Sequence, residues 1–201
     1  MALENYTVRK TERKDISAFI EANHYSGSIN GCIADYCFSL HDAAGTMCGA
    51  MFFGRMAMAG QWKRFAASEG DVIELRRLCC IDATPRNAES FFIGKCLRWL
   101  KKNTRHLIVV SYADAEYGHT GTIYKASNFV MEGRRPGASV ILWNGKRYHD
   151  KAIRTKYRGE LKPFAVRLKD ALANGEAVYA KTAGKFCYTF KLREIKVSNV
   201  L

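Results

Sequence analysis

The pattern of apolar and polar positions changes period twice in the middle of the chain. Residues 72–81 (VIELRRLCCI) interleave β-branched and apolar side chains with charged ones, which predicts a central β-strand. From residue 88 to about 102 the apolar side chains recur every three or four positions, as in an amphipathic helix. The next apolar run, 107–113, is short and branched, so it predicts a buried strand that ends at Asp114.

Weaker patterns on both sides of this centre predict further elements. They are a helix over 16–23 capped by Asp15, strands over 37–40 and 48–54 with a turn over 41–46, a helix over 122–128, strands over 139–143 and 147–152 joined at Asn144-Gly145, a helix over 163–174 and a strand over 185–191. The order strand, loop, helix, strand, helix, strand predicts a mixed α/β domain with a crossover between neighbouring strands.

Length and composition fit one folded domain with a short extension. The chain has 201 residues, of which 48% are apolar, so it can bury a sizeable core. No run approaches the roughly 20 apolar residues that span a bilayer, and residues 1–15 lack the apolar core of a secretion signal. The seven cysteines are odd in number and include no Cys-x-x-Cys pair, which indicates reduced, mostly buried thiols. We therefore expect a cytosolic protein.

Charge is the first clue to function. Thirty-two Lys and Arg against nineteen Asp and Glu give a net charge of +13. This excess favours a polyanionic partner, which could be nucleic acid, an anionic membrane or an anionic cofactor. No basic amphipathic helix of the membrane-surface kind stands out, so nucleic acid is the leading expectation. The alternative is a solvated basic surface with no partner.

The first candidate site is the start of the helix that follows residues 72–81. A helix N-terminus presents unpaired backbone N–H groups and a positive dipole end, which can hold an anion. Arg86 and Asn87 precede this helix and Ser90 lies in its first turn, so we take them as candidate cofactor contacts. A capped helix whose entry is fixed by Pro85 is an equally good interpretation, because the loop is not glycine-rich.

The second candidate site follows the strand that ends at Asp114. Polar residues at the carboxyl end of a central strand line the usual ligand crevice of an open α/β sheet. His119 lies in the next loop and Tyr124 in the next helix, so an Asp, a His and a Tyr could converge for proton transfer. The alternative is that Asp114 caps a turn and Tyr124 packs in the core.

The strand over 72–81 carries charges that need an explanation. A charge in a buried strand is costly unless it is paired or functional. Strand alternation places Glu74 and Arg76 on one side, where they could form a surface pair, and Arg77 on the other. We expect Arg77 to reach a ligand or Asp114.

A metal site is not predicted. The candidate metal ligands are His24, His41, Asp114 and His119. They are scattered along the chain and lack the spacing of a His-x-x-x-His helix or of a site with two histidines and one carboxylate.

These same stretches resemble the Mom family of bacteriophage DNA-modification proteins. The resemblance rests on Glu74-Leu75-x-Arg77-Leu78, on Arg86-Asn87-x-Glu89-Ser90-x-Phe92-Ile93-Gly94-x-Cys96-Leu97, on Ser111-Tyr112-Ala113-Asp114, on Gly118-His119-x-Gly121, on Ile123 to Phe129 and on His24-Tyr25-Ser26. It covers roughly residues 15–135 and leaves the tail after about 150 uncovered.

The resemblance implies a fold similar to that of the GNAT acyltransferases. We then expect an α/β (mixed α+β) class with a central, mostly antiparallel mixed sheet flanked by helices. Residues 1–201 would form a single GNAT-like domain, with 150–201 as a basic C-terminal extension. The usual glycine-rich pyrophosphate loop is replaced by Thr84 to Ser90, which is a departure from an ordinary acetyl-CoA site.

The resemblance also implies conversion of adenine in DNA to its N(6)-carbamoylmethyl form, which shields phage DNA from host restriction enzymes. Arg77, Asp114, Tyr124 and His119 would be catalytic, Ser111 and Asn128 would join the cofactor contacts, and Tyr25 would stack on an extruded base. Phosphate contacts are expected from cations in the hairpin and tail, namely Lys146, Arg147, Arg154, Lys156 and Arg158.

The partner implied is double-stranded DNA in the cytoplasm of an infected or lysogenic bacterium, with no membrane. The donor stays open between acyl-CoA, an aminoacyl-tRNA and another glycine-derived group, and iron could assist. The oligomeric state also stays open, a homodimer included. Two other functions remain, a conventional GNAT N-acyltransferase acting on a protein or small amine, and a DNA-binding anti-restriction protein without chemistry.

Overall fold

The computed structural model describes residues 3–194. The main sheet is built from β1 (Thr7–Thr11), β2 (Tyr36–His41), β3 (Met47–Gly54), β4 (Val72–Cys80), β5 (Ile108–Asp114), β6 (Val130–Arg135) and β12 (Lys185–Lys191). The helices are α1 (Arg13–Asn23), α2 (Ala88–Asn103), α3 (Thr122–Ala126) and α4 (Pro163–Ala173). The remaining strands are β7 (Ser139–Trp143), β8 (Lys146–His149), β9 (Lys156–Tyr157), β10 (Glu160–Leu161) and β11 (Val178–Lys181), and short 3-10 turns join several elements.

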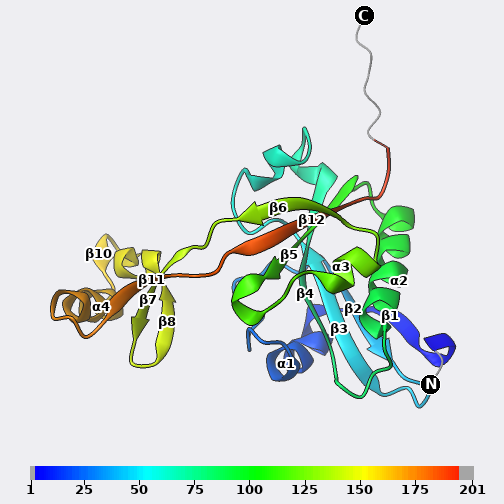
Figure 1. The fold of residues 1–201 in the computed structure, drawn as a ribbon, viewed down its shortest axis with the longest axis horizontal. Helices are drawn as coiled ribbons and strands as arrows, with labels where there is room; N and C mark the ends of the chain where they lie inside the picture. The colour runs from blue at the N-terminus through cyan, green and yellow to red at the C-terminus, as the bar shows by residue number, and fades with distance from the viewer. Residues whose placement is uncertain (1–2, 195–201) are drawn as a thin grey trace, which may run out of the picture. The chain divides into compact units, whose positions relative to one another are not determined.

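The seven main strands form one mixed sheet in the order β1-β2-β3-β4-β5-β12-β6 (Figure 1). The pairs β1–β2, β2–β3 and β3–β4 are antiparallel, and β4–β5 is parallel because α2 makes the crossover between them. This is the α/β class with a largely antiparallel mixed sheet and flanking helices that the sequence predicted.

Helices α1 and α2 cover opposite faces of the sheet. Successive side chains of a strand point to opposite faces, and β2 shows which helix each face meets. Cys37 belongs to the buried cluster around Ile16 and Ile20 of α1, whereas its neighbour Phe38 packs its ring 5.3 Å from that of Trp99 on α2. Both faces of the sheet are therefore buried, which explains why β2 and β3 are almost wholly apolar.

The predicted elements at the centre of the chain are confirmed, and the differences lie at their ends. Asp15 does not cap α1, because Glu12 is the N-cap and Asp15 closes a capping box with it. The strand predicted to run to residue 152 ends at His149, where the backbone turns into a 3-10 helix. Five strands escaped prediction, and they are β1, β6, β9, β10 and β11.

The chain divides into two compact units. The large unit comprises residues 1–113, 121–133 and 187–201, and the small unit comprises residues 114–120 and 134–186. Most of the small unit, residues 134–186, is inserted in the chain between β6 and β12, which are neighbouring strands of the main sheet, whereas residues 114–120 follow β5. The boundary expected at residue 150 therefore falls within the insertion, and residues 185–191 return to the main sheet.

The small unit has its own sheet and its own core. Strands β11, β7 and β8 pair in that order, and β7 and β8 are joined by the Asn144-Gly145 turn that the sequence predicted, with positive φ at both residues. Ile141 packs against Leu168 and Ala171 of α4 in one buried cluster. Three aromatic side chains pack against that cluster, and the ring centroids of Trp143, Tyr148 and Phe164 lie within 6.4 Å of one another.

Candidate active site

Strands β4 and β5 part in the middle of the main sheet. Their pairing runs only from Val72 opposite Ile108 to Leu75 opposite Ser111, although β4 continues to Cys80. The pairing of β3 with β4 skips Arg76, because Phe52 lies opposite Arg77 and Phe53 lies opposite Leu75. Such a bulge bends its strand, and beyond Leu75 the backbone of β4 is no longer paired with β5. We call this end of the pairing the opening between the two strands.

Tyr124 lies buried beside the end of this pairing. Its side chain is 8% exposed and is hydrogen-bonded to the side chain of Ser111, the last paired residue of β5. The rings of Phe129 and Tyr188 lie 5.6 and 5.4 Å away and fix the orientation of the phenol. Helix α3 can approach this closely because Gly121 has no side chain, since a Cβ there would lie 2.3 Å from the Tyr188 ring.

The environment of Tyr124 keeps its hydroxyl protonated. Burial raises the pKa of Tyr124 above its usual value, the hydrogen bond with Ser111 lowers it, and the nearby Glu74 carboxylate and Tyr188 raise it. A protonated phenol beside an opening in the sheet is a proton donor rather than a base. Tyr124 therefore lies in the helix that the sequence predicted and packs in the core, as one of the two alternatives held, and its role in catalysis stays a prediction.

Glu74 and Arg76 form a buried ion pair rather than the surface pair that the sequence suggested. The Arg76 Nη1 atom lies 3.3 Å from Glu74 Oε2, and the two side chains are only 9% and 11% exposed. The loop after β3 supplies further partners, because Nη1 also donates to the Arg55 carbonyl and Glu74 accepts from the Ala57 amide. Arg76 Nε is buried with no hydrogen-bond partner among the described residues.

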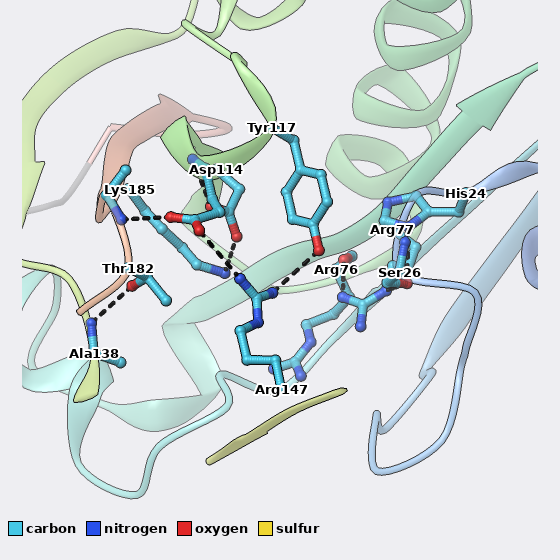
Figure 2. Close-up of polar contacts among 12 residues, drawn as sticks. His24, Ser26, Arg76, Arg77, Asp114, Tyr117, Ala138, Arg147, Thr182 and Lys185 are labelled. Carbon is cyan, nitrogen blue, oxygen red and sulfur yellow. Dashed lines mark hydrogen bonds and ion pairs between the residues drawn. The ribbon is translucent and has the colours of Figure 1, made fainter. Parts of the chain in front are cut away.

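Arg77 connects β4 to the His24-Tyr25-Ser26 element (Figure 2). Its Nε donates to Ser26 Oγ at 3.2 Å, and its Nη1 donates to the Arg76 carbonyl at 2.8 Å. The Ser26 amide donates to His24 Nδ1 at 3.1 Å, so that nitrogen carries a lone pair and a neutral His24 has its proton on Nε2. The structure therefore brings together two motifs that lie about fifty residues apart in the sequence.

Tyr25 is the exposed member of this group. Its side chain is 45% exposed, and its ring lies 4.2 Å from the His24 ring. An exposed ring that is held by its neighbour is a suitable surface for stacking a base. Its role as a stacking residue stays a prediction.

The start of α2 has no side-chain cap. Asn87 is the N-cap residue with φ +70°, and its side chain makes no capping hydrogen bond. Asn tolerates this left-handed conformation, so it replaces a glycine at the turn. Arg86 is exposed, and the Ser90 hydroxyl donates back to the Asn87 carbonyl. The Ala88 amide already donates to the Pro85 carbonyl at 3.1 Å, and anion binding by the other N–H groups of the first turn stays a prediction.

The two other predicted cofactor contacts have structural partners. Ser111 is fully buried and interacts with Tyr124 and with the Leu75 carbonyl at 3.4 Å. Asn128 follows α3 with φ +62°, and its amide donates to the Lys125 carbonyl, which is how helices commonly end. Cofactor binding by either residue stays a prediction.

In the small unit, Asp114 pairs with Lys185. The Lys185 Nζ atom lies 3.0 Å from Asp114 Oδ2, and the other carboxylate oxygen accepts the Glu116 amide at 3.2 Å (Figure 2). The Asp114 side chain is 11% exposed, whereas that of Lys185 is 51% exposed. Asp114 therefore caps a turn, as the alternative interpretation of the sequence held, and its second carboxylate oxygen pairs with the Lys185 ammonium. Lys185 was missed in the sequence because only the return of β12 brings it here.

A second group in the small unit surrounds Arg147. Its guanidinium lies 3.6 Å from a Glu116 carboxylate oxygen, donates to the Tyr117 hydroxyl at 3.1 Å and lies over the Tyr117 ring. The ring of His119 stacks on that of Tyr117 with centroids 6.5 Å apart. Asp114 and His119 thus belong to the small unit and Tyr124 to the large one, so the convergence of all three stays a prediction.

The remaining predicted phosphate contacts are all exposed cations of the small unit. Arg154 pairs with Asp150 at 3.3 Å, and Arg158 lies over the Tyr157 ring. Lys146 and Lys156 have no ion pair among residues 3–194. The unit contains thirteen Lys and Arg against six Asp and Glu, so it carries about half of the net charge in less than a third of the chain.

Neither a metal-binding cluster nor a membrane-spanning helix is present among the described residues. In residues 3–194 no three or more His, Cys, Asp or Glu side chains are grouped so that they could hold a metal ion, iron included. No helix in this range is long and apolar enough to cross a membrane.

Comparison with solved structures defines the class of fold. The chain is similar to an N-acetyltransferase from Staphylococcus aureus (13% identity, TM-score 0.54, covering 94% of this chain and 99% of that one). It is also similar to a ribosomal-protein-S5-alanine acetyltransferase from Vibrio fischeri (8% identity, TM-score 0.54, covering 96% of this chain and 97% of that one). A third similar structure is a spermidine N-acetyltransferase from Vibrio cholerae in complex with CoA and spermine (12% identity, TM-score 0.52, covering 94% of this chain and 96% of that one). The fold is therefore that of the GNAT acetyltransferases.

Within that class, the sequence identifies the family. The model of the Mom protein family matches residues 5–198, so the chain belongs to this family. The match includes the tail that the resemblance in the sequence had left uncovered. A comparison with curated proteins gives no match.

Proposed function

We propose that this chain is a transferase that replaces a hydrogen on the exocyclic amine of adenine in double-stranded DNA with a carbamoylmethyl group. It would act in the cytoplasm of an infected or lysogenic bacterium and shield phage DNA from restriction enzymes. The observation that carries the proposal is a buried, protonated Tyr124 beside the opening between β4 and β5, in a chain of the Mom family.

The opening suits an activated donor with an anionic carrier. Beyond Leu75 the edge of β4 is free of β5, and the first turn of α2 offers backbone N–H groups that no side chain caps. These residues fit acyl-CoA, which would supply an activated acyl group when bound. A carbamoylmethyl group contains the atoms of glycinamide, which acetyl-CoA alone does not supply. We therefore propose a glycine-derived group, carried on coenzyme A or on tRNA, as the donor.

The residues of the chain would then divide the proton transfers. The adenine amine must lose a proton as its nitrogen forms the new bond, and Asp114 would orient the amine or accept that proton. Lys185, whose ammonium lies 3.0 Å from Asp114 Oδ2, would hold the Asp114 carboxylate in position. The bond between the glycyl carbonyl carbon and the carrier would break, and Tyr124 would protonate the sulfur or oxygen of the carrier as it leaves. The N(6)-glycyl adenine formed in this way is an isomer of N(6)-carbamoylmethyl adenine, and it would become the latter when its free amine displaces the amide nitrogen from C6 of the base. Arg77, fixed by Ser26, would stabilise negative charge that develops on the donor.

Access to the adenine amine requires the base to leave the helix. An extruded base is commonly held by stacking on an aromatic ring, which Tyr25 would provide. Exposed cations of the small unit would bind the phosphates on either side of the target, with Lys146, Lys156 and Arg158 free of acidic partners among the described residues. Binding should therefore weaken steeply as salt is raised.

Nucleoside mass spectrometry tests this function. DNA would be isolated from a bacterial host that expresses the chain and from the same host with an empty vector. A new adenosine species, heavier by one carbamoylmethyl group in place of a hydrogen, is expected only with the chain. Unmodified DNA accompanied by a newly acylated protein or small amine would instead indicate a conventional N-acyltransferase. Unchanged DNA, protein and amines would indicate a DNA-binding protein without chemistry.

A further inference from the structure

A groove in the large unit lies apart from the opening between β4 and β5. It has a volume of about 370 Å³ and runs between β1 and α2. It is lined by Tyr6, Thr7, Val8, Lys10, Phe38, Lys95 and Trp99. Lys95 lies seven residues after the first residue of α2, roughly two turns from the end where a cofactor anion would bind. Strand β1 is the edge of the main sheet, so its outer backbone groups are not paired within that sheet.

The groove is positively charged. Lys10 and Lys95 are exposed, no acidic side chain lines the groove, and neither lysine has an ion pair in residues 3–194. Arg98 and Lys102 are also exposed, and their spacing from Lys95 places all three on one face of α2. The ligand that this surface fits is therefore an anion. The row formed by Lys95, Arg98 and Lys102 fits a ligand with several negative charges in a chain.

The floor of the groove is aromatic and rigid. Trp99 is half-buried, and its ring is held by Phe38 at 5.3 Å and Tyr36 at 5.6 Å. The Lys10 ammonium lies 5.7 Å from the centre of the Trp99 ring. A lysine over a fixed ring can bind a phosphate while the ring contacts the sugar or the base. An acidic peptide would use the cations but has no planar group for the ring.

We propose that this groove binds a single-stranded segment of nucleic acid. Phosphates would lie on Lys10 and Lys95, and a base would stack on the exposed part of Trp99. A duplex would not use the groove in the same way, because its bases are stacked on one another and hide their faces. The volume corresponds to the lower end of ligand sites, which suits one nucleotide unit at a time. This surface is additional to the cations of the small unit and does not depend on base modification.

Binding of a fluorescently labelled single strand to the full chain tests the proposal. Anisotropy would be measured at several salt concentrations with a mixed-sequence strand of about 12 nucleotides, which exceeds the groove. Lys10→Gln with Lys95→Gln should lower the slope of log affinity against log salt by about 1.4, because two phosphate contacts are lost. Trp99→Leu should weaken binding at least about fivefold with little change in slope, because stacking is lost but charge is kept.

The matched control is Lys63→Gln with Lys101→Gln, which removes the same charge outside the groove. This control should keep nearly the full slope and affinity. Circular dichroism would establish whether each variant is folded. If Trp99→Leu does not fold, the variant with Lys10→Gln and Lys95→Gln still tests the proposal. Equal losses in the groove and control variants would overturn the proposal. So would equal competition by poly-glutamate of matched charge, or duplex binding that depends on the groove as strongly as single-strand binding does.

Discussion

Removing Glu74 should destabilise the large unit strongly, because it leaves a buried arginine without its counter-ion. The Arg76 guanidinium lies 3.3 Å from the Glu74 carboxylate, and about nine-tenths of each side chain is buried. In the Glu74→Ala variant, the Arg76 guanidinium would keep only the Arg55 carbonyl and the Cys32 sulfur as hydrogen-bond partners among the described residues. Its Nε already has no hydrogen-bond partner among the described residues, so the site cannot readily compensate.

The expected size follows from this burial. Breaking a buried ion pair by deleting one partner costs about 3–5 kcal/mol, because the remaining charge is uncompensated. The Ala57 amide also loses its hydrogen-bond acceptor, and the free-energy cost of that loss is included in the range of about 3–5 kcal/mol. Most domains have a free energy of unfolding of only about 5–15 kcal/mol, so the loss is a large fraction of the total.

Urea denaturation measures the effect. With a slope near 2 kcal/mol per molar urea, the midpoint should fall by about 1.5–2.5 M. Lys14→Ala is the control, since Lys14 and Glu12 pair at 3.0 Å with side chains that are 77% and 72% exposed. An exposed pair of this kind contributes about 0–1 kcal/mol, so its midpoint should barely move.

Replacing both partners separates the charge from the packing. Glu74→Leu with Arg76→Met fills the site with apolar groups and should restore most of the lost stability. A Glu74→Ala loss below about 1 kcal/mol would refute the reasoning, because it would mean that water reaches Arg76 and screens its charge.

Two further predictions concern packing and thiol chemistry. Gly121→Ala should destabilise the chain by about 1–3 kcal/mol, because its Cβ would lie 2.3 Å from the Tyr188 ring, and an unchanged thermal midpoint would contradict this packing. Burial raises the pKa of Cys37 to about 11 and that of Cys79 to about 12, so both thiols should resist alkylation at pH 8 until urea is added; fast labelling of the native chain would contradict this. Because the folded state holds these protons more tightly, stability should be full below pH 9 and fall as pH rises toward 11–12.

Much of the main sheet could be predicted because its elements have strong local patterns. Residues 72–81 are rich in β-branched and apolar side chains, residues 107–113 form a short apolar run, and the helix between them has a clear period, so the crossover followed from the sequence. β1 could not be found in this way, because its five residues (TVRKT) are mostly polar and exposed at the sheet edge. Its position depends on pairing with β2, which is a long-range contact.

In the candidate site too, residues with a local sequence signal could be predicted, and contacts made by the tertiary fold could not. Tyr124 and Asp114 were identified because they follow a central strand, and this position is visible in the sequence. Lys185 and Ser26 were not predicted as partners, since they reach Asp114 and Arg77 only through the tertiary fold. The burial of the Glu74–Arg76 pair depends on the bulge at Arg76, and strand alternation alone gives no sign of a bulge.

The most direct test of the central claim compares adenosine in DNA from cells that express the native chain or Tyr124→Phe at equal folded levels. The variant loses one hydroxyl and keeps the ring that packs on Phe129 and Tyr188, so it should fold normally. We predict carbamoylmethyl adenosine with the native chain and a loss of at least about 100-fold with Tyr124→Phe, as expected when a proton donor is removed. Native levels of modification in the variant, or no modified adenosine with the folded native chain, would contradict the account.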